Sequence, residues 1–425
     1  MALPANSSQS GEKPRDIKLN NRRIVLELLR RQDKITLGEL AASCSLSRNT
    51  VKKCMDFFLE KGIAADAGKG CSTSEGGKKP DMFRLDENWG ILCSFYVRYG
   101  EVRGALYTIG LTRLCADREP LFAYSPGEVV DSCERLLRRL LERCGWDAGR
   151  LKAISCALHG VVDTYTGTVL SEFHAEKSLS GLEDSAGHWN GHVPLGKMLT
   201  ERLGAPVTCS NPVRTMLLCE AEKDTAIRDN SALIYTHDAS PMAALIRGGH
   251  VIQGKRCVLG EIGGIPLNFT AHPDSGTSLG GDGLGQLVCR RRLLEEMNRH
   301  PELLLSSTLY TLGHEPTLSD IFAAAENGDE LGRAMVRHAA RWFAVSIRQF
   351  LFLADPDIIL IQGDYAKAGS YFLETLRQYV KSYVAPSVSV IPDIRLSSQE
   401  EVDSCILGGA IVASGQVFGS DTIYE

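Results

Sequence analysis

Residues 35–62 read ITLGELAASCSLSRNTVKKCMDFFLEKG, and this stretch decides how the first part of the chain folds. The pattern predicts a short helix, a tight corner at residues 43–45 and a longer helix. Thr36 is suited to cap the first helix and Ser47 the second, because a hydroxyl at that position accepts a hydrogen bond from a free amide of the first turn. Apolar residues recur at three- and four-residue spacing, so each helix is expected to bury one face. These apolar positions are Leu37, Leu40, Ala41, Val51, Met55, Phe58 and Leu59.

The opposite face of the second helix begins with polar and basic side chains, which fall together on its first two turns. A helix-turn-helix places the start of its second helix in the major groove of DNA, where such side chains contact phosphates and base edges. An ordinary helical pair with a solvated charged face is the alternative, but the corner, the helix lengths and the basic start together favour DNA binding. The residues expected at the DNA are Thr36, Ser47, Arg48, Asn49, Thr50, Lys52 and Lys53.

The flanking segments predict a winged helix. Residues 19–32 carry the apolar stripe of a helix that can pack across the other two. Residues 63–66 and 81–85 have the pattern of a short hairpin, and its tip at residues 68–80 is rich in Gly, Ser and Thr.

The tip of this hairpin ends in Lys78 and Lys79. Two lysines on a glycine-flexible arm beside a recognition helix can reach phosphates or the minor groove, although a disordered basic loop is the alternative. We therefore expect a winged helix-turn-helix domain at residues 18–86, preceded by a disordered segment at residues 1–17.

The composition fits a DNA reader joined to a soluble body. The 425 residues suggest two or three domains, and an apolar fraction of 44% is that of a globular protein. No run of about 18 apolar residues occurs and the polar start lacks a signal-peptide core, so we expect a cytoplasmic protein without membrane contact. Residues 1–85 hold 16 Lys and Arg against 10 Asp and Glu, whereas residues 86–425 hold 31 against 42. A basic head on an acidic body is typical of such a protein.

The 13 cysteines have no metal-binding spacing, because no two lie closer than ten residues apart. Most are expected to be small buried residues. His188 and His192 have no obvious third ligand nearby. We expect neither a metal nor a cofactor.

From Trp89 onward the pattern changes to alternating strands and helices. This alternation over residues 87–425 predicts an α/β fold divided into two lobes. The expected strands are 91–96, 102–107, 151–158, 205–209, 232–236, 242–247 and 358–361, of which 232–236 and 242–247 form a pair turning at Gly248 and Gly249. The expected helices are 129–144, 213–222, 285–299, 330–353 and 405–417.

The order of these pieces resembles the ROK family, which joins sugar kinases and sugar-responsive repressors on one two-lobed, actin-like (ribonuclease-H-like) fold. The similar segments are GKKP at 77–80, LHGVVD at 158–163, VPLGKMLTERLGAPV at 193–207, NPVRTMLLCE at 211–220, IRGGHVIQGKRCVLGEIGG at 246–264 and ADPDIILIQGDYAKAG at 354–369. The resemblance extends over essentially the whole chain after residue 18 and includes the winged helix of the repressor branch. It implies a two-lobed body that binds an effector and forms dimers.

The departures from the family pattern imply that kinase activity is lost. The glycine turns that cradle ATP phosphates in the kinases correspond here to YVRYG at 96–100 and HDASPM at 237–242. The general base of the kinases is the aspartate of an Asn-Asp-Ala-Asn pattern; here Pro212 follows Asn211 and cannot accept a proton. Asp364 replaces a glycine near the adenosine site. Phosphoryl transfer depends on positioning and charge stabilisation, so we expect no enzyme.

The zinc motif of the family is also altered. Its Glu-x-Gly-His reads EIGG at 261–264, and the cysteine-rich stretch that follows has no cysteine at 278–286. The resemblance leaves Asn211, Glu261 and Gln286 as candidate effector-binding residues. Glu261 capping a turn or pairing with a cation is the alternative, and His159 is expected to be structural.

The sequence therefore predicts a transcriptional regulator of carbohydrate-metabolism genes, a repressor that binds a double-stranded operator as a homodimer or tetramer. A sugar or sugar derivative bound between the lobes would control it. One alternative is a ligand-independent regulator whose body is only a dimer scaffold, and another is an active sugar kinase with a DNA-binding appendage.

Overall fold

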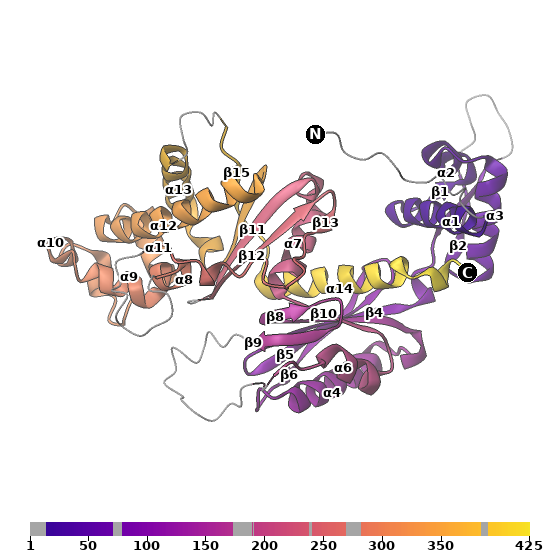
Figure 1. Cartoon of the computed structure of the whole chain (residues 1–425), viewed down its shortest axis with the longest axis horizontal. Coiled ribbons are helices and arrows are strands. Elements are labelled where there is room, and N and C mark those ends of the chain that lie inside the picture. The colour runs from indigo at the N-terminus through magenta and orange to yellow at the C-terminus, as the bar shows by residue number, and fades with distance from the viewer. Residues whose placement is uncertain are drawn as a thin grey trace, which may run out of the picture.

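The computed structural model describes residues 14–70, 79–172, 189, 191–237, 240–268, 282–383 and 390–425. A winged helix lies at one end, and two α/β lobes follow it (Figure 1). The final long helix runs from between the lobes to the winged helix. This arrangement confirms the predicted fold class.

The winged helix forms largely where its local signals predict. Thr36 and Ser47 cap their helices, and Ser45 turns the corner with a φ of 54°. Its first helix begins at Pro14, inside the segment expected to be disordered. The elements are α1 (Pro14–Arg31), β1 (Ile35–Thr36), α2 (Leu37–Cys44), α3 (Arg48–Glu60), β2 (Ala64–Lys69) and β3 (Asp81–Leu85).

The core of the winged helix comes from the apolar stripes of its three helices. Leu26, Leu40, Val51 and Phe58 are fully buried, and burying each such side chain stabilises the fold by about 1.5–3 kcal/mol. Leu59, expected to be inward, is only partly buried. The sheet beside these helices has the strand order β1-β3-β2.

The first lobe is built on a five-stranded sheet of order β10-β7-β4-β5-β6. The helices α4 and α6 cover one face, and the last helix of the chain covers the other. Since β4 is covered on both sides, its apolar run is buried throughout, except for Arg98 at its end. The elements are η1 (Glu87–Trp89), β4 (Ile91–Arg98), β5 (Glu101–Thr108), β6 (Arg113–Pro120), α4 (Pro126–Cys144), η2 (Ala148–Arg150), β7 (Leu151–Leu158), β8 (Gly160–Asp163), β9 (Thr168–Glu172), α6 (Leu195–Leu203) and β10 (Val207–Ser210).

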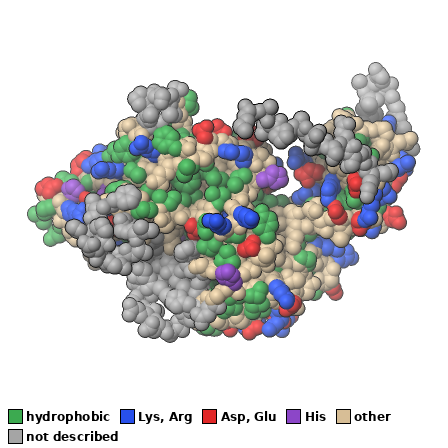
Figure 2. All heavy atoms as spheres, viewed as in Figure 1, with side chains coloured by type: hydrophobic (Ala, Val, Ile, Leu, Met, Phe, Trp, Pro, Cys, Tyr) green, Lys and Arg blue, Asp and Glu red, His purple; other side chains and the backbone are tan. Residues whose placement is uncertain are grey.

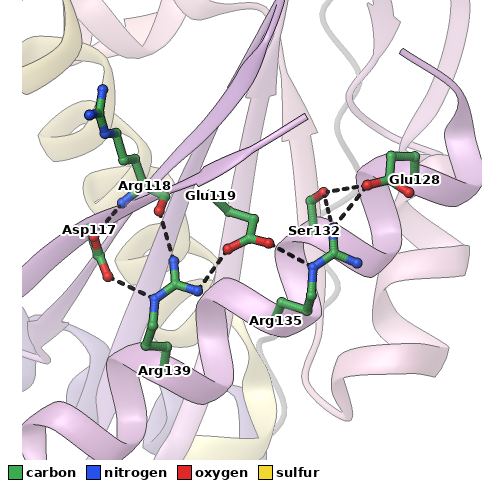
Figure 3. Close-up of polar contacts among 7 residues, drawn as sticks. All are labelled: Asp117, Arg118, Glu119, Glu128, Ser132, Arg135 and Arg139. Atoms are coloured by element: carbon green, nitrogen blue, oxygen red, sulfur yellow. Dashed lines mark hydrogen bonds and ion pairs between the residues drawn. The ribbon is translucent and has the colours of Figure 1, made fainter. Parts of the chain in front are cut away.

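The edge strand β6 was not predicted from the sequence, and Figure 3 shows what holds it. Arg139 on α4 donates to Asp117 Oδ2 at 2.9 Å and to Glu119 Oε2 at 2.7 Å. Arg135 donates to the other oxygen of Glu119 at 2.7 Å. A disulfide also joins Cys115 to Cys144, a pairing that the sequence did not suggest. The strand is thus held by partners on α4, about 20 residues farther along the chain.

The second lobe has a five-stranded sheet of order β13-β12-β11-β14-β15. Its elements are α7 (Pro212–Lys223), η3 (Thr225–Arg228), β11 (Asn230–His237), β12 (Ser240–Arg247), β13 (His250–Val251), η4 (Ile262–Gly264), α8 (Leu284–Val288), α9 (Arg290–Met297), α10 (Pro301–Leu304), η6 (Thr308–Thr311), α11 (Leu318–Glu326), α12 (Glu330–Ala354), β14 (Ile358–Gly363), η7 (Asp364–Lys367), α13 (Gly369–Tyr383) and β15 (Asp393–Leu396).

Two boundaries in this lobe were predicted wrongly. The Gly248–Gly249 turn joins β12 to β13, whereas β11 and β12 are paired up to His237 and Ser240. The helix expected at residues 285–299 is two helices, because the backbone is extended at Cys289.

The last long helix, α14 (Glu401–Gly419), packs against α7, β4 and β7, and η8 (Asp421–Ile423) follows it. A Cβ at Gly408 would overlap the Thr215 carbonyl oxygen, so glycine is required where α14 crosses α7. Among the described helices, α14 alone is long and apolar enough to cross a membrane, but 56% of it is buried within this core. It is thus accounted for as a core helix.

The end of α14 and the segment after it hold the winged helix through a contact that we call the α1 joint: Arg22 and Arg30 of α1 with Phe418 and Tyr424. Arg30 lies 3.7 Å from the centre of the Phe418 ring and donates to Ser414 Oγ at 2.9 Å. Arg22 is buried and donates to the Tyr424 carbonyl oxygen. The body therefore contacts the DNA-binding unit through its last residues.

Candidate nucleic-acid interface and inter-lobe site

The start of α3 presents an exposed basic surface. Arg48, Asn49, Lys52 and Lys53 are all exposed on its first turns, as predicted. The positive end of the helix dipole adds to their field. Lys52 differs from Lys53 because it forms an ion pair with Asp56 at 2.7 Å. Lys53 thus has the freer charge for a phosphate.

The predicted hydroxyl contacts already have intramolecular roles. Thr36 Oγ1 accepts from the Glu39 amide, and Glu39 returns the bond to the Thr36 amide at 2.8 Å. These bonds from Thr36 lower the pKa of Glu39. Ser47 Oγ accepts from the Thr50 amide at 3.1 Å and pairs with Thr50 Oγ1 at 2.9 Å. Thr36 therefore fixes the start of α2, and Ser47 and Thr50 fix the start of α3, whatever contact they make with DNA.

The wing lies beside these helices. Its strands β2 and β3 pair antiparallel, and Lys69 forms an ion pair with Asp81 near the tip. Lys79 is exposed at the end of the arm, and Lys78 lies outside the described residues. Figure 2 shows Lys and Arg side chains over the winged-helix part of the surface, mixed with Asp and Glu.

Four aromatic side chains lie together between the lobes, and two of them, Tyr96 and His237, belong to the segments that the resemblance matches to phosphate-binding turns. We call Tyr96, His159, Tyr235 and His237 the inter-lobe aromatic cluster. The His159 ring lies 6.1 Å from that of Tyr235, which stacks on His237 at 6.4 Å. Tyr96 and His159 belong to the first lobe and the other two to the second, so the cluster links the lobes.

The polar atoms of this cluster connect it to α14. The Tyr96 hydroxyl donates to Glu401 Oε1 at 2.9 Å and pairs with His159 Nε2 at 2.8 Å. Burial, with help from His237 and Arg98, lowers the pKa of His159 to about 3, so its ring is neutral at physiological pH. This is the structural role expected of His159.

Asn211 is buried and its side-chain amide is fully engaged. Its oxygen accepts from the Val213 amide at 3.0 Å and caps α7. Its nitrogen lies 3.0 Å from the Gly160 carbonyl oxygen and 3.2 Å from Met242 Sδ. Pro212 follows as the first residue of α7. Asn211 thus joins β8 of the first lobe to β12 of the second.

Glu261 lies beside a solvent-open cavity of about 490 Å³ that is also lined by Lys255 and Arg256. Burial raises the pKa of Glu261 to about 7, although the nearby Arg214 acts in the opposite direction. A carboxyl group that is half-protonated near neutral pH can both donate and accept hydrogen bonds, which suits sugar hydroxyls.

Gln286 has a different environment. Its side-chain oxygen accepts from the Gly283 amide at 3.0 Å and caps α8. Gly283 packs against the Gly263 carbonyl oxygen, so α8 begins next to the turn that carries Glu261. The structure thus brings Gln286 near this turn, with its oxygen already bonded.

Arg214 is the residue that the sequence reasoning missed. It is 5% exposed, in the first turn of α7, and its charge acts on Glu261. The signal in the sequence was an arginine at the last position of the segment matched to Asn-Asp-Ala-Asn, two residues after Pro212.

A winged helix-turn-helix joined to a two-lobed α/β body defines the class of DNA-binding transcription regulators with an actin-like second domain. The chain belongs to the ROK family, which its sequence matches over residues 135–416. Residues 19–64 match the winged helix-turn-helix DNA-binding family. The family and domain predicted from the sequence are thereby confirmed.

Individual relatives resemble the chain to different extents. The xylose repressor of Caldicellulosiruptor bescii is 20% identical over 402 residues, which cover 92% of this chain and 95% of the repressor. A glucokinase of Halalkalibacterium halodurans is 25% identical over 230 residues, 52% of this chain and 68% of the kinase. The crystal structure of a ROK family transcriptional regulator, a homologue of the E. coli MLC protein, has a TM-score of 0.76 at 20% identity and covers 96% of this chain and 98% of its own. The repressor thus matches along nearly the whole chain and the kinase along about half.

Proposed function

We propose that the protein is a homodimeric, sugar-responsive transcriptional repressor of carbohydrate-metabolism genes that acts in the cytoplasm. The observation that carries this proposal is the exposed basic start of α3 within a winged helix that α14 connects to the inter-lobe region. The xylose repressor that matches most of the chain supports the sugar response. We place the domain boundary between residues 86 and 87.

Control would follow from the two contacts of α14. Its first residue, Glu401, accepts from Tyr96 in the inter-lobe aromatic cluster, and its last turns form the α1 joint. A ligand that prefers one angle between the lobes would shift α14 and thereby the winged helix. Two winged helices in a dimer would then move in or out of register with the half-sites of a pseudo-palindrome.

The inter-lobe aromatic cluster supports the absence of kinase activity. Tyr96 and His237 lie in the two segments that the resemblance matches to the phosphate-binding glycine turns, and Pro212 offers no base. A coupled ADP-release assay over a panel of sugars should show no turnover. Turnover that is abolished by Glu261→Gln would overturn this part of the proposal.

DNA binding is tested by the salt dependence of affinity for genomic fragments. Lys53→Ala should lower affinity for all sequences and reduce the slope of log K against log salt by about 0.9. Lys52→Ala should act in the same direction but less, because Asp56 already pairs with Lys52. Lys197→Ala is a matched control, since Lys197 is an exposed helical lysine that pairs with Glu201 four residues on, far from the winged helix. Unchanged affinity in both Lys52 and Lys53 variants would refute this DNA face.

The scaffold alternative has one observation in its favour: the side chains of Asn211 and Gln286 are already hydrogen-bonded within the protein. Thermal-shift measurements against hexoses, pentoses, amino sugars and their phosphates separate the two cases. A ligand that binds the native state must raise its stability. Stabilisation by any of them supports an effector, and none at millimolar concentration would favour the scaffold.

A further inference from the structure

The side chain of Arg214 is largely buried, and its guanidinium group keeps a little solvent contact but has no partner among the described residues. Among the described residues, no hydrogen bond and no ion pair within 4 Å involves this side chain, which is 5% exposed. A guanidinium has five N–H donors and keeps its charge, so burial without acceptors is costly. Buried polar groups in native proteins are nearly always matched. A group of this kind therefore indicates an acceptor that binds from outside.

The surroundings of Arg214 leave its charge in place. The carboxyl group that acts on it is that of Glu261, whose pKa of about 7 leaves it partly protonated at neutral pH. Cys257 and Tyr165 also act on Arg214, and burial raises the pKa of the Cys257 thiol. No complete negative charge therefore offsets the guanidinium.

The N-terminus of α7 adds positive potential, although its amides have partners. Pro212 has no N–H, the Val213 amide bonds to Asn211 Oδ1, and the Arg214 amide bonds to the Asn211 carbonyl oxygen at 3.1 Å. The field of the helix remains, so the site favours an anion while the donors must come from the Arg214 side chain.

The cavity beside Glu261 extends this positive region. It measures about 490 Å³, within the range of small-molecule sites, and Lys255 and Arg256 line it. Arg214 is the cation that acts on Glu261, and Lys255 and Arg256 lie in the lining of the cavity, whose other residues include Val258, Leu259, Ile262 and Ile265. The space suits a monosaccharide with one charged substituent.

We propose that Arg214 binds the anionic substituent of the effector, so that the ligand is an acidic sugar carrying a phosphate ester or a carboxylate. This inference rests on the proposed effector control and names the chemical class of that ligand. Arg214 forms the paired N–H contacts to the anion, and Glu261 contacts sugar hydroxyls. A planar guanidinium matches both phosphate and carboxylate in this way.

The first experiment uses wild-type full-length protein and isothermal titration calorimetry. The ligands are glucose and xylose, hexose and pentose phosphates, hexuronates, and inorganic phosphate alone. At least one acidic sugar should bind about 100-fold more tightly than its neutral parent, as expected for two charge-assisted hydrogen bonds, and its affinity should fall with salt. Comparing the sugar phosphates with the hexuronates shows whether the anionic substituent is a phosphate ester or a carboxylate.

The second experiment uses Arg214→Gln and Arg214→Lys, with Arg256→Gln as the matched control at the cavity. Arg214→Gln should lose the preference for the acidic sugar over its neutral parent. Arg214→Lys should keep part of it, and Arg256→Gln most of it. Circular dichroism and the melting temperature without ligand establish that each variant is folded. If a variant is unfolded, the affinities of the wild-type protein for acidic and neutral sugars decide the proposal.

Three outcomes separate this inference from the proposed function. Tight binding of a neutral sugar, with no preference for its acidic form, would overturn the role of Arg214 and leave sugar control standing. No sugar bound while operator binding persists would remove both. An acidic sugar bound equally by wild type and Arg214→Gln would show that the anion lies elsewhere and refute the inference.

Discussion

The winged helix and the inter-lobe region differ in whether their buried polar groups have hydrogen-bond partners. Among the described residues of the winged helix, every buried side-chain nitrogen and oxygen has a hydrogen-bond partner. In the inter-lobe region, the Tyr235 hydroxyl and Thr236 Oγ1 have none within the described part of the chain.

This difference indicates two kinds of structural task. Each unmatched buried polar group costs about 1–3 kcal/mol, so several in one place are explained best by a second state that matches them. The winged helix must hold one shape to read DNA, and its polar groups are satisfied by near neighbours. In the proposed control the inter-lobe region responds to a ligand, and the unmatched hydroxyls of Tyr235 and Thr236 are available for a second state.

The largest expected effect concerns the crossing of α14 over α7, where the inter-lobe region is tightly packed. Gly408→Ala should destabilise the protein by about 3 kcal/mol or more, because its Cβ would overlap the backbone of Thr215. Gly415→Ala in the same helix is the matched control, since no atom lies within 4 Å of a Cβ there. It should gain up to about 1 kcal/mol from helix propensity. Urea unfolding measures both, and equal stabilities would contradict the tight crossing.

The next effect tests the α1 joint. Arg22→Ala should cost about 2 kcal/mol, because Arg22 lies 3.3 Å from the Phe57 ring centre and donates to the Tyr424 carbonyl oxygen. Lys18→Ala, at an exposed position of α1, should be nearly neutral. If both variants unfold at the same urea concentration, the joint contributes no stability.

A pH profile tests the inter-lobe region through Glu261. Its folded pKa of about 7 lies above the ordinary value of 4.5, so the protonated form stabilises the fold. That stability is complete below pH 4.5 and is lost as the pH rises through 7. The free energy of unfolding of wild type should therefore fall relative to Glu261→Gln by on the order of 2 kcal/mol between pH 4 and pH 8. Parallel profiles for the two proteins would contradict the raised pKa.

A substitution at the N-cap of α2 tests how much the capping hydrogen bond stabilises the winged helix. Thr36→Ala should destabilise it by about 1 kcal/mol, because the Glu39 amide loses its acceptor. Thr36→Ser keeps the hydroxyl and should restore most of this stability. Thermal unfolding is the measurement, and a Thr36→Ala protein as stable as wild type would show that the capping box is dispensable.

The smallest expected effects compare two buried tyrosines of the inter-lobe aromatic cluster. Tyr235→Phe should be neutral or stabilising by up to about 1 kcal/mol, since its hydroxyl makes no hydrogen bond with the described residues. Tyr96→Phe should instead cost about 1 kcal/mol, because it breaks the bonds to His159 and Glu401. If both substitutions change the free energy of unfolding in the same direction, the difference between hydrogen-bonded and unbonded hydroxyls is refuted.

The winged helix could be predicted from sequence because its signals are local. Thr36 and Ser47 cap the helices that follow them directly, and α3 has a continuous apolar stripe. The strand β6 could not be predicted in this way. Its charges resemble a loop in sequence, and they become a strand surface only because arginines of α4 lie against them.

The inter-lobe site was predicted in part. The resemblance named Glu261 as a candidate effector-binding residue; its place beside a cavity and its raised pKa did not follow from the sequence, because burial depends on the whole fold. Arg214 was missed because its place at the end of the segment matched to Asn-Asp-Ala-Asn does not by itself show that the side chain is buried. Only the packing of both lobes around α7 reveals that it has no partner.

The α1 joint also has a consequence for synthesis. Arg22 and Tyr424 are 402 positions apart, so at a translation rate of about 5–20 residues per second roughly 20–80 s separate their appearance. During that interval the ribosome carries three helices with an exposed basic surface, while the residues that fasten them to the body do not yet exist. The winged helix of a nascent chain is therefore complete before the contacts through which the body would control it. Control of DNA binding begins only when α14 and the residues after it have been made.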